Sequence, residues 1–370
     1  MRIALVGRRF DPEGGGTERD LLITARILVG AGHQVTLYAN EVRGVSPEFD
    51  TRRVGARLPN RSMRLLMFAN SAAVKARRDG AELVLSFARI VEADILRSGG
   101  GAHASYVRAA RRWLGAGAAT AMRLSPYHRA QIAIERRGFA SRRLLRAIAV
   151  SEMVRTDLMD SFRLDPAKVA TLYNGVDLER FAPSDRRVRA QARRELGVPH
   201  EAVAAVFVGN GFARKGLRFL LEAWPLVEGR PHLIVAGADR AVAAYRRVAA
   251  RIGIGERVVF AGPQRGIERI FAAGDLFAMP SLFEPFGNAI MEAMASGLPA
   301  VCSSACGAAE AFEGMGECVV RDPANPEEIA ARVNFALKNR GDLSIAARAA
   351  VERFTWDGYG VRLLELLSSR

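Results

Sequence analysis

Short apolar runs alternate with longer amphipathic stretches along the first 40 residues of the chain. RIALVG at 2–7 is an apolar run of the kind found in strands that are buried on both faces. A glycine-rich segment follows at 8–16, residues 17–29 have the helical pattern, and QVTLYA at 34–39 is a second apolar run. This order predicts a strand, a helix and a second strand, the unit from which parallel doubly wound sheets are built.

Apolar runs of strand length recur through the rest of the chain, and the pattern restarts after residue 165. The runs lie at 82–87, 144–151, 169–176, 202–210, 232–237, 257–262, 275–281 and 298–303. We therefore expect an α/β protein with two Rossmann-like doubly wound domains, residues 1–165 and 166–350, that face each other across a cleft. Residues 351–370 contain a further predicted helix, and packing against the N-terminal domain is one option for it.

Composition narrows the possible partners and compartments. The chain has 370 residues and a net charge of +15, which favours nucleotides, nucleic acid, anionic lipid or phosphorylated glycan as partners. Three cysteines without a Cys-x-x-Cys pair give no zinc or disulfide framework. No apolar run is long enough for a membrane span or a signal peptide, so we expect a cytoplasmic protein or one on the cytoplasmic face of a membrane.

The stretch SLFEPFGNAIMEAMASGLPAV at 281–301 carries two glutamates, Glu284 and Glu292. Pro285 disfavours helical geometry at Glu284, so we expect the helix to begin near Gly287 or Asn288, with Glu292 about one turn inside. The free N–H groups of such a helix end attract phosphate, and carboxylates accept hydrogen bonds from sugar hydroxyls. One interpretation is a diphosphate site flanked by two acids. The other is a capping residue followed by a solvated helix residue.

A second charged stretch, GNGFARKGL at 209–217, follows a predicted strand and places Arg214 and Lys215 just before a helix. Two adjacent cations at a strand-to-helix turn suit a diphosphate. An ordinary solvated loop is the alternative. We expect Lys215 to be an exposed cleft cation whose loss would leave the fold intact.

Four motifs stand in order along the chain: GGTERD (15–20), YNGVDLERF (173–181), VGNGFARKG (208–216) and FEPFGNAIMEAMASGLPAV (283–301). Together they resemble the motifs of the retaining glycosyltransferases of family 4, which have the GT-B fold. The FDPEGGGTERDLL loop and the FARKG turn are most similar to those of the members that add the first glucose to the inner-core heptose of lipopolysaccharide.

The resemblance implies a role for each matched position. Glu292 would bind the ribose of the nucleotide, and Glu284 would bind hydroxyls of the donor sugar. Arg214 and Lys215 would neutralise the diphosphate and stabilise the leaving nucleotide, and the turn at 262–265 would line the base. The other substrate-binding positions implied are Gly15, Gly16, Gly287, Asn288, Ala289 and Ile290.

Three further positions carry open alternatives. His103 follows a glycine run where many members place a histidine against the donor sugar; it is either catalytic or structural. Asp20 either contacts the acceptor, or caps its helix or stabilises its first turn through the helix dipole. Asn210 stands where some members carry a further arginine, so phosphate neutralisation would rest on the Arg-Lys pair alone.

The family also implies retaining, same-face transfer, in which the departing diphosphate takes the proton of the acceptor. The chain contains no Asp-x-Asp sequence, which fits a metal-independent enzyme in which Arg214 and Lys215 replace the cation. No cofactor is expected besides the nucleotide sugar, which is a co-substrate.

Residues 104–146 hold ten arginines and a single acid, Glu135, with apolar and aromatic residues interleaved. This pattern predicts one or two basic amphipathic helices that suit the anionic inner face of the cytoplasmic membrane. A solvated arginine-rich face is the alternative. Nucleic acid is not expected, because no recognised nucleic-acid module accompanies the charge.

The combined expectation is a peripheral membrane enzyme that moves glucose from UDP-glucose onto a membrane-linked glycan such as the lipopolysaccharide inner core. A mannosyl- or other hexosyltransferase with a different lipid or polysaccharide acceptor is one alternative. A non-catalytic protein that binds nucleotide sugars or anionic glycans is another.

Overall fold

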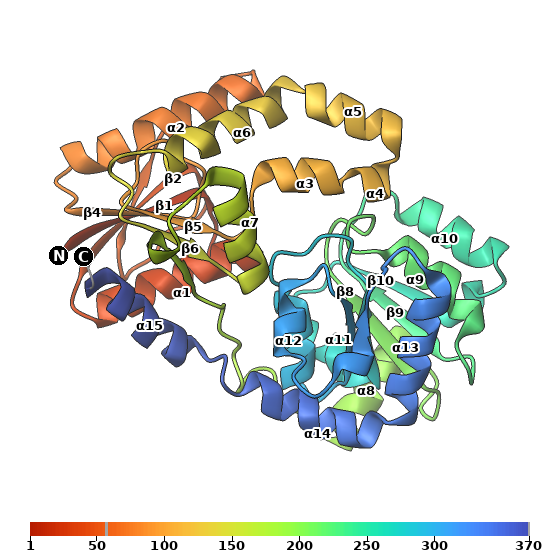
Figure 1. The fold of residues 1–370 in the computed structure, drawn as a ribbon. Helices are drawn as coiled ribbons and strands as arrows, with labels where there is room; N and C mark the ends of the chain where they lie inside the picture. The colour runs from red at the N-terminus through yellow and green to blue at the C-terminus, as the bar shows by residue number, and fades with distance from the viewer. Residues whose placement is uncertain (56–57, 369–370) are drawn as a thin grey trace. The chain divides into compact units, whose positions relative to one another are not determined.

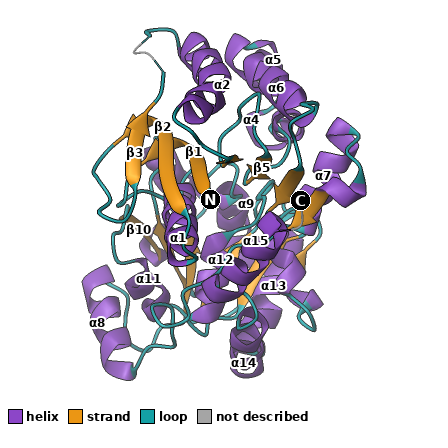
Figure 2. Cartoon of the chain, turned by 90° about the vertical axis from the view of Figure 1, so that its left-hand side faces the viewer, coloured by secondary structure: helices purple, strands orange, loops and turns teal. Residues whose placement is uncertain are grey.

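The computed structural model describes residues 1–55 and 58–368, and its described part forms two compact units (Figure 1, Figure 2). Residues 1–111, 115–174 and 356–368 belong to the N-terminal unit, and residues 112–114 and 175–355 to the C-terminal unit. The contacts divide the chain between Asn174 and Gly175, later than the boundary expected from the sequence. The expected cleft concerns the placement of the two units and stays a prediction.

The N-terminal unit contains a parallel sheet of seven strands within the described residues, in the order β3-β2-β1-β4-β5-β6-β7. The strands are β1 (Arg2–Phe10), β2 (Gln34–Val42), β3 (Asp50–Arg53), β4 (Leu83–Ser86), β5 (Ile95–Ser98), β6 (Arg146–Ala149) and β7 (Val169–Thr171). The helices are α1 (Gly16–Gly30), α2 (Arg61–Arg78), α3 (His103–Ala109), α5 (Ala116–Leu124), α6 (Pro126–Phe139), α7 (Glu152–Phe162) and α15 (Trp356–Ser368). Helix α4 (Arg111–Leu114) has its first residue in this unit and the other three in the second.

The C-terminal unit contains a parallel sheet of six strands among the described residues, in the order β10-β9-β8-β11-β12-β13. The strands are β8 (Ala204–Val208), β9 (His232–Ala236), β10 (Val258–Gly262), β11 (Leu276–Met279), β12 (Ala300–Ser303) and β13 (Val319–Val320). The helices are α8 (Arg186–Leu196), α9 (Leu217–Ala223), α10 (Val242–Arg251), α11 (Ile267–Ala273), α12 (Asn288–Ala295), α13 (Pro326–Lys338) and α14 (Arg340–Val351).

The two sheets confirm the predicted α/β class with two Rossmann-like, all-parallel halves. Both are covered by helices, which is why their central strands are apolar on both faces. In the N-terminal unit α1 and α15 lie on one face of the sheet, and α2 and α6 lie on the other (Figure 1). Strands β3, β5 and β13 fall outside the runs that predicted strands. They are short, and β5 carries Arg97 in its middle.

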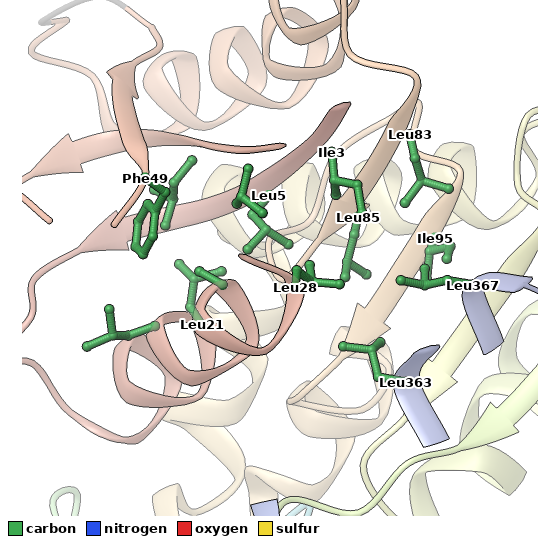
Figure 3. Packing of buried hydrophobic residues seen from close by; sticks show 14 of the residues in the cluster. Ile3, Leu5, Leu21, Leu28, Phe49, Leu83, Leu85, Ile95, Leu363 and Leu367 are labelled. Carbon is green, nitrogen blue, oxygen red and sulfur yellow. The ribbon is translucent and has the colours of Figure 1, made fainter. Parts of the chain in front are cut away.

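The last helix packs into the core of the N-terminal unit (Figure 3). Ile3 and Leu5 of β1 and Leu28 of α1 belong to the same buried cluster as Leu363 and Leu367 of α15. The final two residues of the expected C-terminal helix, 369 and 370, lie outside the described residues.

Each sheet has a switch point, where successive connections leave in opposite directions along the sheet. In the N-terminal unit it lies between β1 and β4, and in the C-terminal unit between β8 and β11. Parallel α/β sheets bind ligands at the carboxyl ends of the strands that flank this point. Within the described part of the chain, no helix has the length and apolar character needed to cross a bilayer.

The basic stretch at 104–146 differs from its prediction in detail. Instead of one or two helices, the chain forms α3, α4, α5 and α6 in succession. Nine of the ten arginines are exposed, the exception being the half-buried Arg146. Glu135 lies on α6, is buried, and forms an ion pair with Arg89.

Candidate active site

The turn between β8 and α9 brings the Arg-Lys pair to the switch point of the C-terminal sheet. Gly216 ends this turn with a φ of +79°, and a Cβ there would lie 2.0 Å from the carbonyl oxygen of Pro280. Gly209 begins it, and a Cβ there would lie 2.4 Å from Cε of Lys215. The two glycines therefore allow the turn to fold tightly against the end of β11 and leave room for the lysine side chain.

Arg214, Lys215 and Glu284 form one ion cluster, which we call the cationic corner. Nζ of Lys215 donates to Oε2 of Glu284 at 2.6 Å, and Nη1 of Arg214 donates to the same oxygen at 3.0 Å. Arg214 also donates to the carbonyl oxygen of Phe283 at 2.6 Å. Two cations share one carboxylate, so the corner keeps an excess positive charge that a bound diphosphate would neutralise.

The cluster is largely removed from solvent, and this corrects one expectation. Lys215 is buried, with 8% of its surface exposed, so it is not the exposed cation that the sequence predicted. Its loss would leave the carboxylate of Glu284 poorly compensated. Burial raises the pKa of Glu284, but the charges and hydrogen bonds of Lys215 and Arg214 outweigh this and hold the pKa at about 2.

Glu284 is held by backbone as well as by charge. Its N–H donates to the carbonyl oxygen of Ala305 at 2.9 Å, and its own carbonyl oxygen accepts from the N–H of Gly307 at 2.9 Å. The residue forms an isolated parallel bridge with Cys306, ahead of α12, so it lies in a loop, as Pro285 predicts.

Helix α12 begins at Asn288, after Gly287 with a φ of +109°. The N–H groups of Gly287 and Ala289 donate to no protein acceptor among the described residues, as expected for a phosphate-binding helix end. The N–H of Ile290 differs from the expectation, because it donates to the carbonyl oxygen of Gly287 at 2.9 Å. A phosphate at this helix end would therefore be bound through the residues before Ile290.

Glu292 lies inside α12 and is 7% exposed, which excludes the interpretation of a solvated helix residue.

The turn expected to line the base follows β10, at the same sheet edge as the cationic corner. It begins at Gly262, whose φ is +70°, and Nε2 of Gln264 donates to the carbonyl oxygen of Ala261 at 2.7 Å. The C-terminal candidates therefore come from loops and from α12, at one edge of one sheet.

The N-terminal candidates occupy different environments. His103 is the first residue of α3 and is buried, and its Nε2 shares a hydrogen bond of 2.9 Å with Nδ1 of His128. Burial, and then the charges of Arg89 and His128, lower the pKa of His103 to about 3. His103 is therefore neutral at physiological pH. Its backbone N–H donates to Oε2 of Glu135 at 2.7 Å.

Asp20 is buried in α1 and is paired within its own unit. Oδ2 of Asp20 accepts from Nη2 of Arg97 at 3.3 Å and from Nδ2 of Asn174 at 3.0 Å. Its position, one turn inside α1, is not that of a helix cap. The pairing favours a structural role over the expected contact with an acceptor.

The glycine loop before α1 contains Gly15, which precedes the helix, and Gly16, which begins it. Gly14, just before them and not among the expected binding positions, is more tightly packed than Gly15. A Cβ at Gly14 would lie 2.7 Å from Cβ of Glu18 and 2.8 Å from the carbonyl oxygen of Asp11. The sequence shows three consecutive glycines at 14–16, but it does not say which of them packs against the helix.

The fold and the site define the class of the protein. A parallel sheet with two cations, a carboxylate and a helix N-terminus at its switch point is an α/β unit built for an anionic ligand such as a nucleotide. The chain joins this unit to a second parallel α/β unit.

Comparisons with known proteins agree with this class. Residues 14–180 match the family described as Glycosyltransferase Family 4, and residues 202–339 match the family described as Glycosyl transferases group 1. The chain belongs to these family 4, group 1 glycosyltransferases.

Curated relatives and solved structures extend the comparison. An uncharacterized glycosyltransferase, MJ1607, of Methanocaldococcus jannaschii is 28% identical over 57% of this chain and 56% of its own length. A D-inositol 3-phosphate glycosyltransferase of Salinispora arenicola is 31% identical over 60% of this chain and 54% of its own length. The matched part thus spans about half the length of these relatives.

The solved structures identify the fold as GT-B. The crystal structure of WaaG, a glycosyltransferase involved in lipopolysaccharide biosynthesis, superimposes with a TM-score of 0.85 at 20% identity and full coverage of both chains. Anabaena Alr3699/HepE in complex with UDP and glucose gives a TM-score of 0.74 at 20% identity, with 100% of this chain and 99% of that chain covered.

Proposed function

We propose that this protein transfers a hexose from a nucleotide sugar to a glycan acceptor, with retention of the anomeric configuration. The observation that carries the proposal is the cationic corner at the switch point of the C-terminal sheet, beside the N-terminus of α12. Arg214 and Lys215 would bind the diphosphate, Glu284 would bind hydroxyls of the donor sugar, and Glu292 would bind the ribose.

In the proposed reaction the acceptor hydroxyl oxygen attacks C1 of the donor sugar from the face of the leaving group. The bond between C1 and the diphosphate oxygen breaks, and this oxygen takes the proton of the acceptor hydroxyl. Arg214 and Lys215 would stabilise the negative charge that develops on the diphosphate, and no protein nucleophile is needed. His103, neutral at physiological pH, would contribute a hydrogen bond to the donor sugar and not a proton.

For the donor we propose UDP-glucose. Support comes from the structural similarity to Anabaena Alr3699/HepE, which was solved with UDP and glucose. GDP-mannose is the alternative, and the turn at 262–265 is the segment expected to distinguish the two bases. A protein that only binds nucleotide sugars is disfavoured, because the acid and both cations expected of a transferase are present together.

For the acceptor we propose a membrane-linked glycan, such as the inner core of lipopolysaccharide, reached from the cytoplasmic face. The exposed arginines of residues 104–146 support this, since they suit anionic headgroups. Helix α2, which packs against α6, adds an exposed apolar stripe of Met63, Leu66, Met67 and Val74. Apolar residues that flank basic ones are typical of helices that lie in a membrane interface. A phosphorylated polyol, as in the names of the inositol relatives, is the alternative acceptor.

The donor is tested with the purified protein and a panel of UDP-, GDP- and ADP-sugars. A ligand that binds only the folded state raises the melting temperature, so UDP-glucose should give the largest shift. Turnover of that donor is then compared between the wild type and Lys215→Met, with Lys338→Met of α13 as the matched control. We expect the first substitution to reduce turnover about a hundredfold or more, and the control to leave it unchanged. Near-normal turnover in Lys215→Met would contradict the proposal that Lys215 binds the diphosphate of the donor.

The membrane association is tested by sedimentation with anionic liposomes. Replacing Arg136, Arg137, Arg142 and Arg143 by glutamine should weaken binding, and the residual binding should fall as salt rises. The control replaces an equal number of exposed arginines in the C-terminal unit, namely Arg186, Arg187, Arg247 and Arg251. Equal liposome binding by the two quadruple variants would contradict the proposal that residues 104–146 form a specific membrane-binding surface.

A further inference from the structure

The turn that carries Arg214 and Lys215 is only weakly held by its own backbone. Three of its glycines have positive φ, namely +145° at Gly209, +74° at Gly211 and +79° at Gly216. Glycine can adopt such conformations without a steric penalty, but it also leaves the chain many others. The N–H groups of Lys215 and Gly216 donate within the turn at 3.3 Å each, which is long for such a bond. The turn therefore depends on bonds to neighbouring segments.

Two side chains tie the first half of this turn to the adjacent turn, which follows β9. Oδ1 of Asn210 accepts from the N–H of Ala238 at 2.7 Å. In return, Oδ2 of Asp239 accepts from the N–H of Phe212 at 2.7 Å. Oδ1 of Asp239 accepts from the N–H of Ala241 at 2.7 Å, which fixes the carboxylate in its own turn. Each turn thus offers a side-chain acceptor to a backbone donor of the other, and we call the two bonds between the turns the reciprocal clasp.

Close packing accompanies the clasp. The ring of Phe212 is buried and meets the ring of Tyr245 of α10 edge to face, with their centroids 5.7 Å apart. Gly237 allows the two turns to approach each other, because a Cβ there would lie 2.1 Å from the carbonyl oxygen of Gly209. The turn that carries the two cations is therefore fitted to the turn beside it.

The residue type at position 210 matters, because the clasp needs an acceptor there. The amide of Asn210 supplies an oxygen, whereas an arginine at this position would have only donors and could not bond to the N–H of Ala238. Asn210 is exposed and Asp239 is half-buried, so the clasp lies at the rim of the sheet edge and not in the core. Breaking it should therefore cost little global stability.

We propose that Asn210 and Asp239 are positioning residues for the donor, because they hold the turn in the conformation in which Arg214 and Lys215 bind the diphosphate. The proposal gives neither residue a contact with the reacting atoms. A turn that is already held in its binding conformation loses less conformational entropy when the ligand binds, so the ligand binds more tightly. The inference rests on the proposed function in taking the ligand to be a nucleoside diphosphate sugar.

The test measures binding of UDP to the full chain by calorimetry. Asn210→Ala and Asp239→Ala should each weaken UDP binding about threefold to tenfold, which is the usual effect of losing one hydrogen bond. The matched control is Asn334→Ala of α13. Oδ1 of Asn334 accepts from the N–H of Glu228 at 2.9 Å, so the control breaks the same kind of bond in the same unit, between α13 and the segment that precedes β9. We expect the control to leave UDP binding unchanged.

Two further variants separate the hydrogen bond from the charge of Asp239. Asp239→Asn and Asp239→Ala both remove the charge, but only asparagine keeps an acceptor oxygen. We therefore expect Asp239→Asn to bind UDP more tightly than Asp239→Ala. The double variant with alanine at 210 and 239 should bind UDP about as well as the weaker single variant, because both substitutions break one clasp.

Hydrogen exchange gives a readout that needs no ligand. The backbone amide of Lys215 should exchange faster in Asn210→Ala than in the wild type or in Asn334→Ala, because the turn opens more often. Thermal unfolding of each variant separates a local effect from a failure to fold, and we expect the melting temperatures of Asn210→Ala and Asn334→Ala to be similar.

Unchanged exchange at Lys215 in Asn210→Ala would overturn the inference. So would UDP affinities of Asn210→Ala and Asp239→Ala equal to that of the control, equal affinities of Asp239→Asn and Asp239→Ala, or multiplicative effects in the double variant. Absence of UDP binding in the wild type would contradict the proposed function and this inference with it. Normal UDP binding in the wild type and in all the variants would contradict only the role of the clasp.

Discussion

The cationic corner gives the sharpest test of how charge is arranged in this protein. The perturbation is Glu284→Gln, which keeps the size of the side chain and removes its charge. The carboxylate holds Lys215 at 2.6 Å and Arg214 at 3.0 Å, and both contacts lie in a largely buried environment. The substitution therefore leaves two cations close together without their shared counter-ion.

The size of the effect follows from the pKa of Glu284. A pKa of about 2, against an ordinary value of 4.5, corresponds to about 3 kcal/mol in favour of the ionised form in the folded protein. This stabilisation is complete above the ordinary pKa and is lost as the pH falls toward 2, because the unfolded chain takes up the proton first. Removing one partner of a buried ion pair costs about 3–5 kcal/mol, so two arguments give a similar magnitude.

The assay is native-state hydrogen exchange of the backbone amides of β8 and β11, which reports opening of the C-terminal unit alone. At pH 7 we expect the opening free energy to fall by about 3 kcal/mol in Glu284→Gln. The matched control is Glu268→Gln, which breaks an exposed pair with Arg180 and should change it by less than about 0.5 kcal/mol.

A second readout separates the electrostatic argument from simple loss of packing. Without Glu284 the corner carries two unneutralised cations, so UDP should bind more tightly while sugar transfer is lost. The reasoning would be refuted if Glu284→Gln and Glu268→Gln opened with the same free energy, or if the first bound UDP more weakly than the wild type.

Three further predictions address the glycine turn, the buried histidine and the last helix. Gly216→Ala should lower the melting temperature far more than Gly229→Ala, because both residues have positive φ but only the first would place a Cβ against backbone. The ring resonances of His103 should stay constant from about pH 5 to 8, because burial lowers its pKa to about 3; a midpoint near 6.5 in a proton NMR titration would contradict this. Stability should correspondingly fall as the pH drops below about 6.5, because the unfolded histidine binds a proton that the folded one does not. Leu363→Ala should cost about 2–5 kcal/mol in urea unfolding of the N-terminal unit, whereas Val361→Ala on the exposed side of α15 should cost less than about 1 kcal/mol.

Much of the C-terminal site could be predicted from the sequence because its determinants are local. Pro285 places Glu284 in a loop, and the glycine at 287 precedes the helix that the pattern predicts. Arg214 and Lys215 lie within one short turn after an apolar run. What the sequence left open was whether the two acids are solvated. The structure buries Glu292 and leaves only 13% of the Glu284 side chain exposed.

The N-terminal unit was less accessible to sequence reasoning, because its parts come from distant segments. Arg8, Arg89 and Arg97 meet around one cavity only because β1, β4 and β5 end at the same sheet edge. Strand β5 itself escaped prediction, since four residues with a central arginine lack a strand pattern. The pairing of that arginine with Asp20 explains how the charge is tolerated.

The sequence alone thus determined the α/β class, the two parallel halves and the family, because periodic apolar runs and short motifs act over a few residues. The tertiary structure decided which charges are buried, which are paired and which remain available to a ligand. These properties depend on contacts between segments far apart in the chain, such as Lys215 with Glu284 and Arg8 with Tyr127. Burial and charge compensation are properties of the packed chain, so they follow from the fold and cannot be obtained from the order of residues.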